Sequence, residues 1–111
     1  MTDRQYLRVG CEGRVCYVSG PISGWPAWRV RFAVAERVLM GLGALAVLTP
    51  RALPVGLTYD QYMRICMPMV DAAETVVLLP NWVGSPGAQA EFRYAASMRR
   101  MICFWREAGE R

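Results

Sequence analysis

Four short segments of the chain are almost wholly apolar and do not alternate with polar residues, and this pattern constrains the fold more than any other feature. The segments span residues 14–19, 44–50, 75–80 and 101–105. Strands of a parallel sheet that is covered on both faces are continuously apolar, whereas half-solvated strands alternate with polar residues. Segments with apolar residues at helical spacing lie between them, at 27–42, 58–67 and 86–99. This alternation predicts an α/β three-layer sandwich, Rossmann-like or flavodoxin-like, with four or five parallel strands.

The length of the chain, 111 residues, predicts a single domain over residues 1–111. The two ends, residues 1–13 and 106–111, are expected to be loose. Thr58 opens the middle helix with a capping-box pattern, and Pro68 is expected to kink or end that helix. In folds of this kind ligands bind at the carboxyl ends of the strands, so the loops that follow the strands are expected to form any site.

The absence of histidine excludes Ser-His-Asp and Cys-His catalysis, so carboxylates would have to act as acid, base or nucleophile in any enzyme of this sequence. The four cysteines form no CxxC pair. They are therefore expected to be reduced, buried thiols, and neither a metal nor a cofactor is expected.

The net charge is +4, and it is carried by thirteen arginines that are scattered along the chain without a run. A basic stripe is typical of proteins that bind nucleic acid, so a nucleic acid polymer is not expected as a partner. Hydrophobic residues make up 54 % of the sequence, but the longest apolar run, residues 38–48, is too short to span a bilayer. This high share of hydrophobic residues is expected to be buried in the interface of a homo-oligomer, a dimer or larger, and not in a membrane. Without a secretory signal, the cytoplasm is the expected compartment.

The segment NWVGSPGAQAEF contains the strongest local indication of a binding site. Ser85 is placed to cap a helix whose first residue is Pro86. The backbone amides of Gly87 and Ala88 would then face outward at the positive end of the helix dipole, where phosphate and carboxylate groups bind. Glu91 follows Gly87 by one turn, which would place its carboxylate beside a bound anion. The alternatives are a helix start that binds nothing and a solvated glutamate.

Asp71 and Glu74 are the other acidic candidates, because they precede the strand that ends at this loop. A pair of carboxylates across the C1 atom of a sugar is the usual device for breaking N- and O-glycosidic bonds. One carboxylate acts as nucleophile or stabiliser, and the other moves protons. The alternative for each residue is a solvated carboxylate at the end of a helix.

The segments YVSGPISG (17–24) and VVLLPNWVGSPGAQAEFRYA (76–95) resemble a small family of phage and bacterial proteins within the nucleoside 2-deoxyribosyltransferase-like superfamily. This superfamily includes 2′-deoxynucleoside 5′-monophosphate N-glycosidases, and the resemblance covers most of the chain. It implies that Glu91 is a nucleophile that attacks C1′ of deoxyribose and expels the base. It also implies that Ser85 contacts the 5′-phosphate, because the transferases have an aspartate at this position and the glycosidases have a serine.

The same resemblance assigns further residues to a substrate pocket. Tyr17 and Trp82 would stack on the base or enclose it. The loop after the first strand would line the sugar and phosphate, through Ser19, Gly20, Pro21, Ser23 and Gly24. The glycosidases have an arginine near the position of Ser23, so Arg29 or Arg31 would have to neutralise the phosphate here.

The resemblance therefore predicts hydrolysis of the N-glycosidic bond of a (deoxy)nucleoside 5′-monophosphate, with Glu91 as the nucleophile and release of the free base. The second carboxylate of the site would be Glu74 or Asp71. The expected partner is a small-molecule nucleotide or nucleoside. Three alternatives stay open: transfer of the deoxyribosyl group to a second base, a nucleotide-binding or sensor module without catalysis, and a structural or interaction protein.

Overall fold

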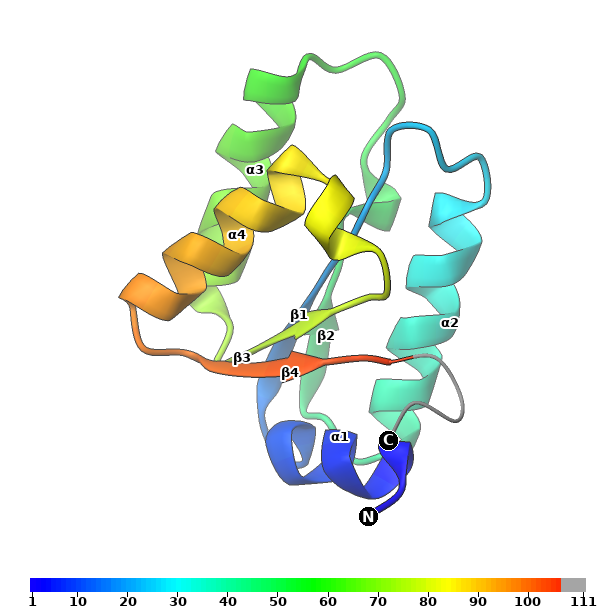
Figure 1. Ribbon diagram of the computed structural model, residues 1–111, viewed down its shortest axis with the longest axis vertical. Helices are drawn as coiled ribbons and strands as arrows, with labels where there is room; N and C mark the ends of the chain where they lie inside the picture. Colours follow the sequence, from blue (N-terminus) through cyan, green and yellow to red (C-terminus); the bar gives the residue numbers. More distant parts are fainter. Residues whose placement is uncertain (107–111) are drawn as a thin grey trace.

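The computed structural model describes residues 1–106 and places four α-helices and four strands in them (Figure 1). In chain order the elements are α1 (Asp3–Cys11), β1 (Val15–Ser19), α2 (Trp28–Gly41), β2 (Ala46–Leu48), the 3-10 turn η1 (Pro50–Ala52), α3 (Tyr59–Ala72), β3 (Thr75–Leu78), the 3-10 turn η2 (Trp82–Gly84), α4 (Pro86–Ser97) and β4 (Met101–Phe104). Apart from Arg106, the carboxyl end that was expected to be loose (106–111) lies outside the described residues.

All four strands are parallel, in the order β2-β1-β3-β4. Tyr17 of β1 is paired with Leu48 of β2 and with Val76 of β3, and Val77 of β3 is paired with Cys103 of β4. The predicted α/β fold with a parallel sheet is confirmed, with four strands and not five in the part of the chain that the structure describes. The two central strands, β1 and β3, are buried almost throughout, which explains their continuously apolar sequence.

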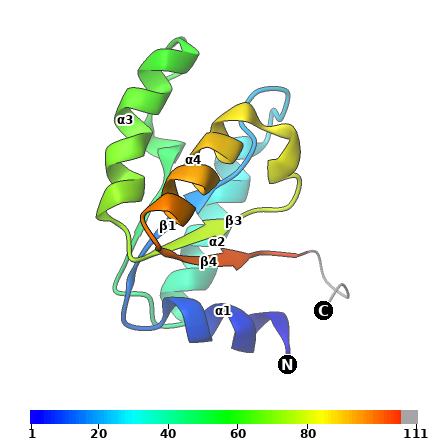
Figure 2. The ribbon, with the colours of Figure 1, turned by 60° about the vertical axis from the view of Figure 1, so that its left-hand side comes forward.

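The helices cover both faces of the sheet (Figure 2). On the face of α1 and α2, Phe32 packs in one cluster with Val18 and Val77. On the face of α3 and α4, Val70 packs in a second cluster that includes Tyr17. Connections between parallel strands are right-handed, so the connection toward β2 and the connections back toward β3 and β4 place their helices on opposite faces. The result is the predicted three-layer arrangement.

The amino-terminal residues, which were expected to be loose, form α1. Gln5 donates its backbone N–H to Oγ1 of Thr2 (3.2 Å), and Thr2 donates its own to Oε1 of Gln5 (2.7 Å). Leu7 and Cys11 lie one turn apart and are buried against the sheet. The prediction of a loose amino terminus was wrong because a helix of nine residues leaves only a short apolar pattern in the sequence. The stability of such a helix comes from tertiary packing.

α3 continues through Pro68, whereas the sequence predicted a kink or an end there. Proline removes one helical hydrogen bond, which is why it usually interrupts a helix. Cys66 and Val70 lie on either side of Pro68 and are buried against the sheet, whereas Pro68 faces solvent. This packing on both sides holds the helix together across the missing bond. The helix starts as predicted, with a capping box between Thr58 and Gln61.

The longest apolar run of the sequence, residues 38–48, is not one element. It covers the end of α2, a turn that contains the buried Leu42 and Ala44, and β2. Within residues 1–106, no helix is both long and apolar enough to cross a membrane.

Gly10 allows α1 to lie directly on the sheet. A β-carbon at this position would be 2.2 Å from Sγ of Cys103 in β4, which is far closer than van der Waals contact. Gly10→Ala is therefore expected to lower the free energy of unfolding by about 1–3 kcal/mol, the usual result of overpacking a core. Urea denaturation measures this loss.

Gly41→Ala is the matched control for Gly10→Ala. Gly41 is also helical, and a β-carbon there would meet nothing within 4 Å. Its replacement should leave the free energy of unfolding unchanged or slightly higher, because alanine favours helix. Adding Cys103→Ala to Gly10→Ala should recover part of the loss, and a double variant as unstable as the single one would contradict the overpacking.

Candidate functional site

The carboxyl ends of β1 and β3 are adjacent in the sheet, and the chain leaves them toward opposite faces. β1 leads into α2, and β3 leads into α4. The loops that follow the two strands, residues 20–27 and 79–85, therefore separate from each other. Ligands of open α/β sheets bind in the crevice where two neighbouring strands lead to opposite faces of the sheet.

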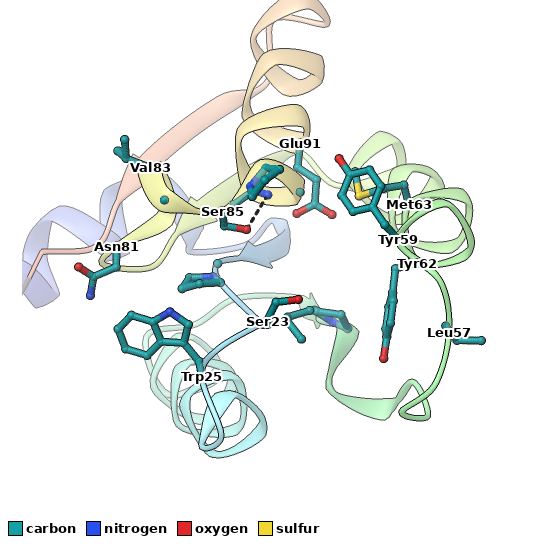
Figure 3. Close-up of a pocket in the computed structure, with 18 of the residues that line it drawn as sticks. Ser23, Trp25, Leu57, Tyr59, Tyr62, Met63, Asn81, Val83, Ser85 and Glu91 are labelled. Carbon is teal, nitrogen blue, oxygen red and sulfur yellow. Dashed lines mark hydrogen bonds between the residues drawn. The ribbon is translucent and has the colours of Figure 1, made fainter.

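A pocket of about 580 Å³ lies at this point (Figure 3). Its volume is typical of sites for small molecules. The wall is assembled from segments that are far apart in the sequence. Its residues are Tyr17, Gly20, Pro21, Ile22, Ser23, Trp25, Pro50, Leu57, Tyr59, Tyr62, Met63, Asn81, Val83, Gly84, Ser85, Pro86, Gly87, Ala88 and Glu91.

The pocket has two distinct ends. Figure 3 shows Trp25 and Asn81 at one end, and Tyr62 and Leu57 at the other. Glu91 lies between the two ends, on α4. A ligand that fills the pocket would therefore pass in front of this carboxyl group.

Glu91 is buried, with 5 % of the residue exposed. Ala88 and Ala95 flank it on the buried face of α4. Tyr17 donates its hydroxyl hydrogen to Oε2 (2.7 Å), and Ser19 donates to Oε1 (2.6 Å). Both donors belong to β1, so the central strand fixes the orientation of the carboxyl group on the helix.

Burial raises the pKa of Glu91 to about 7, because the ionised form loses hydration, and the hydrogen bonds from Ser19 and Tyr17 lower the pKa in part. Burial, together with the charge of Glu91, raises the pKa of Tyr17 well above its usual value, so this hydroxyl keeps its proton. A carboxyl group with a pKa near 7 is present in both forms at neutral pH. It can act as a nucleophile when ionised or as a proton donor when neutral.

The amino terminus of α4 contributes to the same pocket. Ser85 caps the helix, because its Oγ accepts the backbone N–H of Ala88 (3.2 Å), and Pro86 is the first helical residue as predicted. The prediction that the amide of Ala88 is available to an anion was wrong, since the cap uses it. The N–H of Gly87, in the first turn, has no helical partner and belongs to a residue of the pocket wall.

A family model described as a domain of unknown function, DUF4406, matches residues 14–104. The chain belongs to the DUF4406 family. Neither the curated proteins nor the solved structures contain a match to it. The matched region begins after α1 and ends with β4, so it contains the whole wall of the pocket.

Most residues predicted for a site meet at the pocket of the DUF4406 domain. Those that line it are Tyr17, Gly20, Pro21, Ser23, Ser85, Gly87, Ala88 and Glu91. Ser19 lies behind the wall, where it is fully buried and donates to Glu91.

Asp71 and Glu74, predicted as alternatives for the second carboxylate, lie at the opposite edge of the sheet. Both precede β3, whereas the pocket is at its carboxyl end. Oε1 of Glu74 accepts the backbone N–H of Val15 (3.0 Å), and Oδ1 of Asp71 accepts the hydroxyl of Tyr94 (2.8 Å). A four-residue strand is about 13 Å long at ~3.3 Å per residue. Neither group reaches the pocket, where Glu91 is the single carboxylate among the described lining residues.

Trp82 does not enclose the pocket, as the resemblance had implied. Its ring centroid lies 5.0 Å from that of Phe92 and 5.9 Å from that of Phe104, in an aromatic cluster beside α4 and β4. Gly24 also lies outside the lining. Its φ of +78° makes it the turn residue of the first loop, a role that glycine fills without strain.

Arg29 was predicted to neutralise a phosphate, with Arg31 as the alternative, but neither lines the pocket. The guanidinium of Arg29 lies 4.8 Å from the ring centroid of Trp28, and its Nη2 donates to the carbonyl oxygen of Leu53. Among the described lining residues of the DUF4406 domain, Glu91 is the only one with a formally charged side chain.

More than half of the pocket wall was not predicted from the sequence, including the part that faces the start of α4. The lining residues outside the predicted set are Ile22, Trp25, Pro50, Leu57, Tyr59, Tyr62, Met63, Asn81, Val83, Gly84 and Pro86. Tyr59, Tyr62 and Met63 have the i, i+3, i+4 spacing of one helix face, which was a usable signal. No feature of the sequence shows that this face of α3 lies opposite α4.

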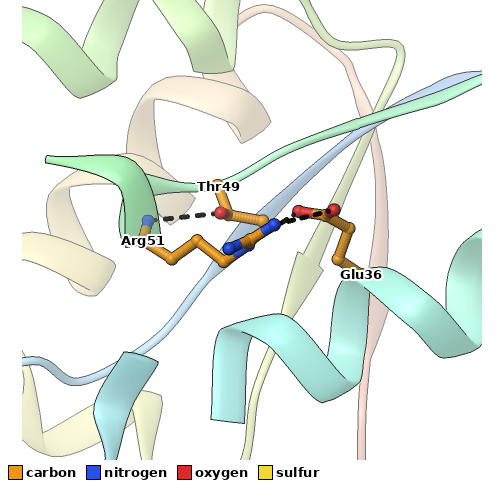
Figure 4. Close-up of polar contacts among 3 residues, drawn as sticks. All are labelled: Glu36, Thr49 and Arg51. Carbon is orange, nitrogen blue, oxygen red and sulfur yellow. Dashed lines mark hydrogen bonds and ion pairs between the residues drawn. The ribbon is translucent and has the colours of Figure 1, made fainter. Parts of the chain in front are cut away.

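Polar contacts of Thr49 and Arg51 anchor η1 to α2 (Figure 4). The first residue of η1, Pro50, lines the pocket. Oγ1 of Thr49 accepts the backbone N–H of Arg51 (3.2 Å) and caps the turn. Arg51 pairs with Glu36 of α2 through Nε and Oε1 (3.1 Å) and through Nη2 and Oε2 (3.3 Å). Two parallel hydrogen bonds fix orientation as well as distance, so this loop is anchored to α2.

None of the four cysteines lines the pocket, and all four are buried without a disulfide, as predicted. Cys11, Cys16 and Cys103 belong to the cluster under α1 and α2, and Cys66 belongs to the cluster under α3 and α4. Within residues 1–106, no group of three or more cysteine, aspartate or glutamate side chains is arranged to hold a metal ion.

Proposed function

We propose that the DUF4406 domain hydrolyses the N-glycosidic bond of a (deoxy)nucleoside 5′-monophosphate and releases the free base. The observation that carries this proposal is the carboxyl group of Glu91, which two hydroxyls hold in the wall of a pocket large enough for a nucleotide. The resemblance of the loops around it to the nucleoside 2-deoxyribosyltransferase-like superfamily supports C1′ of the sugar as the target.

In the first step, the ionised carboxylate of Glu91 attacks C1′ of the bound nucleotide. The bond between C1′ and the base nitrogen breaks, its electron pair leaves with the base, and the base takes a proton from water. The transition state carries positive charge on the sugar ring, which the adjacent carboxylate stabilises. The product is an ester between Glu91 and the sugar.

In the second step, water attacks C1′ of this ester. The bond between C1′ and Oε breaks, its electron pair returns to Glu91 as a carboxylate, and the water releases a proton. The hydroxyls of Tyr17 and Ser19 stabilise the returning carboxylate by hydrogen bonding. Transfer of the sugar differs only in that a second base, and not water, attacks the ester.

The start of α4 supports a phosphorylated substrate. The positive end of the helix dipole, the N–H of Gly87 and the hydroxyl of Ser85 are all at the pocket wall. Glu91 follows Gly87 by four residues, a rise of about 6 Å along the helix, which is comparable with the length of a ribose 5′-phosphate. A phosphate near Ser85 would place C1′ near Glu91.

A nucleotide-binding module without catalysis is the second candidate. Two observations favour it: Asp71 and Glu74 lie at the far edge of the sheet, and no arginine is among the described lining residues. This function predicts that nucleotides bind without any release of base.

Incubation of the purified protein with deoxy- and ribonucleoside 5′-monophosphates, followed by chromatography of the free base, separates the two functions. Base release from at least one monophosphate is expected, and excess free base added to the mixture would reveal transfer as a new nucleotide. Nucleotide binding without release, in folded protein, would favour the binding module.

Asp71→Asn and Glu74→Gln are expected to leave the rate of base release unchanged, because both carboxylates lie at the far edge of the sheet. Both substitutions keep an oxygen that can accept the hydrogen bonds found there. The measurement is the initial rate of base release at saturating nucleotide. A variant that folds normally but loses most of this rate would contradict the single-carboxylate mechanism.

A further inference from the structure

Arg29 and Arg31, in the first turns of α2, extend toward the loops of the pocket and not into the pocket itself. Each donates a hydrogen bond to a loop carbonyl, and each lies over a tryptophan ring. The two arginines serve different loops, so their effects on the pocket can be separated.

Arg31 links the two loops that form one end of the pocket. Its Nη2 donates to the carbonyl oxygen of Pro80 (3.1 Å). The next residue, Asn81, has a φ of 70° in the left-handed region and lines the pocket. The guanidinium of Arg31 also lies 4.6 Å from the ring centroid of Trp25, a lining residue of the other loop. Trp25 and Asn81 stand together at this end of the pocket in Figure 3.

The charge of Arg31 is not neutralised within the described part of the chain. No acidic side chain forms an ion pair with it there, and its Nη1 is buried without a hydrogen-bond partner among those residues. A buried donor without a partner destabilises the folded state. Arg31 is therefore not explained by a contribution to stability. It is better explained by the positioning of the two loops and by a positive charge close to one end of the pocket.

Arg29 provides a matched comparison at the other end of the pocket. It donates to the carbonyl oxygen of Leu53, in the loop that supplies Pro50 and Leu57 to the wall. Arg29 does not connect this loop to Trp25 or Pro80, because the guanidinium of Arg29 is bonded to Leu53 and lies over Trp28.

We propose that Arg31 is a positioning residue that fixes Trp25 and Asn81 at the end of the pocket where Ser85 would meet a phosphate, without itself touching the ligand. The assignment of that end to a phosphate rests on the proposed function, whereas the positioning of the loops does not. Arginine is required because one planar guanidinium donates to a carbonyl and stacks on an indole ring at the same time, which the ammonium of lysine does less well.

Amide hydrogen exchange in the protein without ligand tests the positioning. The backbone N–H groups of Trp25 and Ser85 are hydrogen-bonded within the two Arg31-linked loops, and that of Leu53 is bonded within the Arg29-linked loop. In Arg31→Met, exchange at Trp25 and Ser85 should be about tenfold faster, with Leu53 unchanged. Arg29→Met should produce the reverse pattern. Unchanged exchange at Trp25 and Ser85 in Arg31→Met would overturn the proposal.

Arg31→Lys separates positioning from charge. It keeps the positive charge and loses the guanidinium plane, so exchange at Trp25 and Ser85 should resemble that of Arg31→Met. Wild-type exchange in Arg31→Lys would show that an ammonium group positions the loops equally well, and this result would contradict the requirement for a guanidinium plane.

Calorimetric titration in the Glu91→Gln background, which is expected to bind without releasing base, with a 2′-deoxynucleoside 5′-monophosphate and with the same nucleoside without phosphate tests the phosphate end. Arg31→Met should weaken binding of the monophosphate by about tenfold and binding of the nucleoside much less. Equal weakening of both would contradict the assignment of this end to the phosphate. If the wild type binds neither compound while the exchange pattern holds, the proposed function fails and the positioning role stands.

Discussion

Glu91→Gln is expected to lower the rate of base release by on the order of 10³-fold or more, because it removes the only nucleophile that the mechanism uses. Glutamine has nearly the same shape as glutamate, and the hydroxyls of Tyr17 and Ser19 can still bond to it, one as donor and one as acceptor. The pocket should therefore keep its form. The monophosphate should bind to the variant with an affinity close to that of the wild type.

Single-turnover kinetics at a series of wild-type concentrations gives the rate of base release and the affinity for the best monophosphate, and calorimetric titration gives its affinity for Glu91→Gln. Binding retained with base release lost supports Glu91 as the nucleophile. If Glu91→Gln instead releases base at a rate within tenfold of the wild type, attack by Glu91 is excluded, and water must reach C1′ without it.

The same substitution is expected to stabilise the fold above neutral pH. The pKa of Glu91 is about 7 in the folded protein, against 4.5 for an ordinary glutamate. The folded state therefore holds this proton more tightly than the unfolded state does. The contribution of Glu91 to the free energy of unfolding is therefore highest below pH 4.5. It falls as the pH rises and reaches its lowest value above pH 7. A shift of this size corresponds to about 3 kcal/mol.

Urea denaturation of the wild type and of Glu91→Gln at several values between pH 5 and pH 8.5 measures this effect. The stability of the variant relative to the wild type should increase across this range by an amount approaching ~3 kcal/mol. A difference between the two proteins that stays constant over the whole range would show that Glu91 is not held in an environment that opposes its ionisation.

Activity should follow the opposite trend with pH. The nucleophile is the ionised form, so kcat/KM for base release should rise through the folded pKa of Glu91, about 7, and level off above it. The site would then be most reactive in the pH range where Glu91 destabilises the fold most, and such opposition between activity and stability is common at active sites.

Several parts of the fold and of the candidate site follow from short-range patterns. The apolar segments at β1 and β3 are continuous because both faces of these strands are covered. Thr58 and Ser85 each cap the helix that they precede, as their position in the sequence predicted. The spacing of Gly87 and Glu91 placed both within the first turns of one helix, and both are at the pocket wall.

The errors arose where a sequence neighbour of the site was taken for a spatial neighbour. Glu74 is four residues from the end of β3, but an extended strand carries it to the far edge of the sheet. Trp82 lies in the correct loop, but its ring packs against Phe92 and Phe104 and not against the pocket. α1 was missed because it depends on packing of Leu7 and Cys11 against the sheet more than on its own pattern.

The sequence by itself determined the elements from β1 to β4, their parallel arrangement and the loops that could form a site, because apolar periodicity and helix caps act over a few residues. It did not determine α1 or the continuation of α3 through Pro68. Only the tertiary structure decided which of these loops meet and what surrounds Glu91. The order β2-β1-β3-β4 brings the hydroxyls of β1 against a carboxyl group on α4, more than seventy positions along the chain. The pKa of that group depends on burial and on hydrogen bonds from another element, and such long-range contacts leave no local trace in a single sequence.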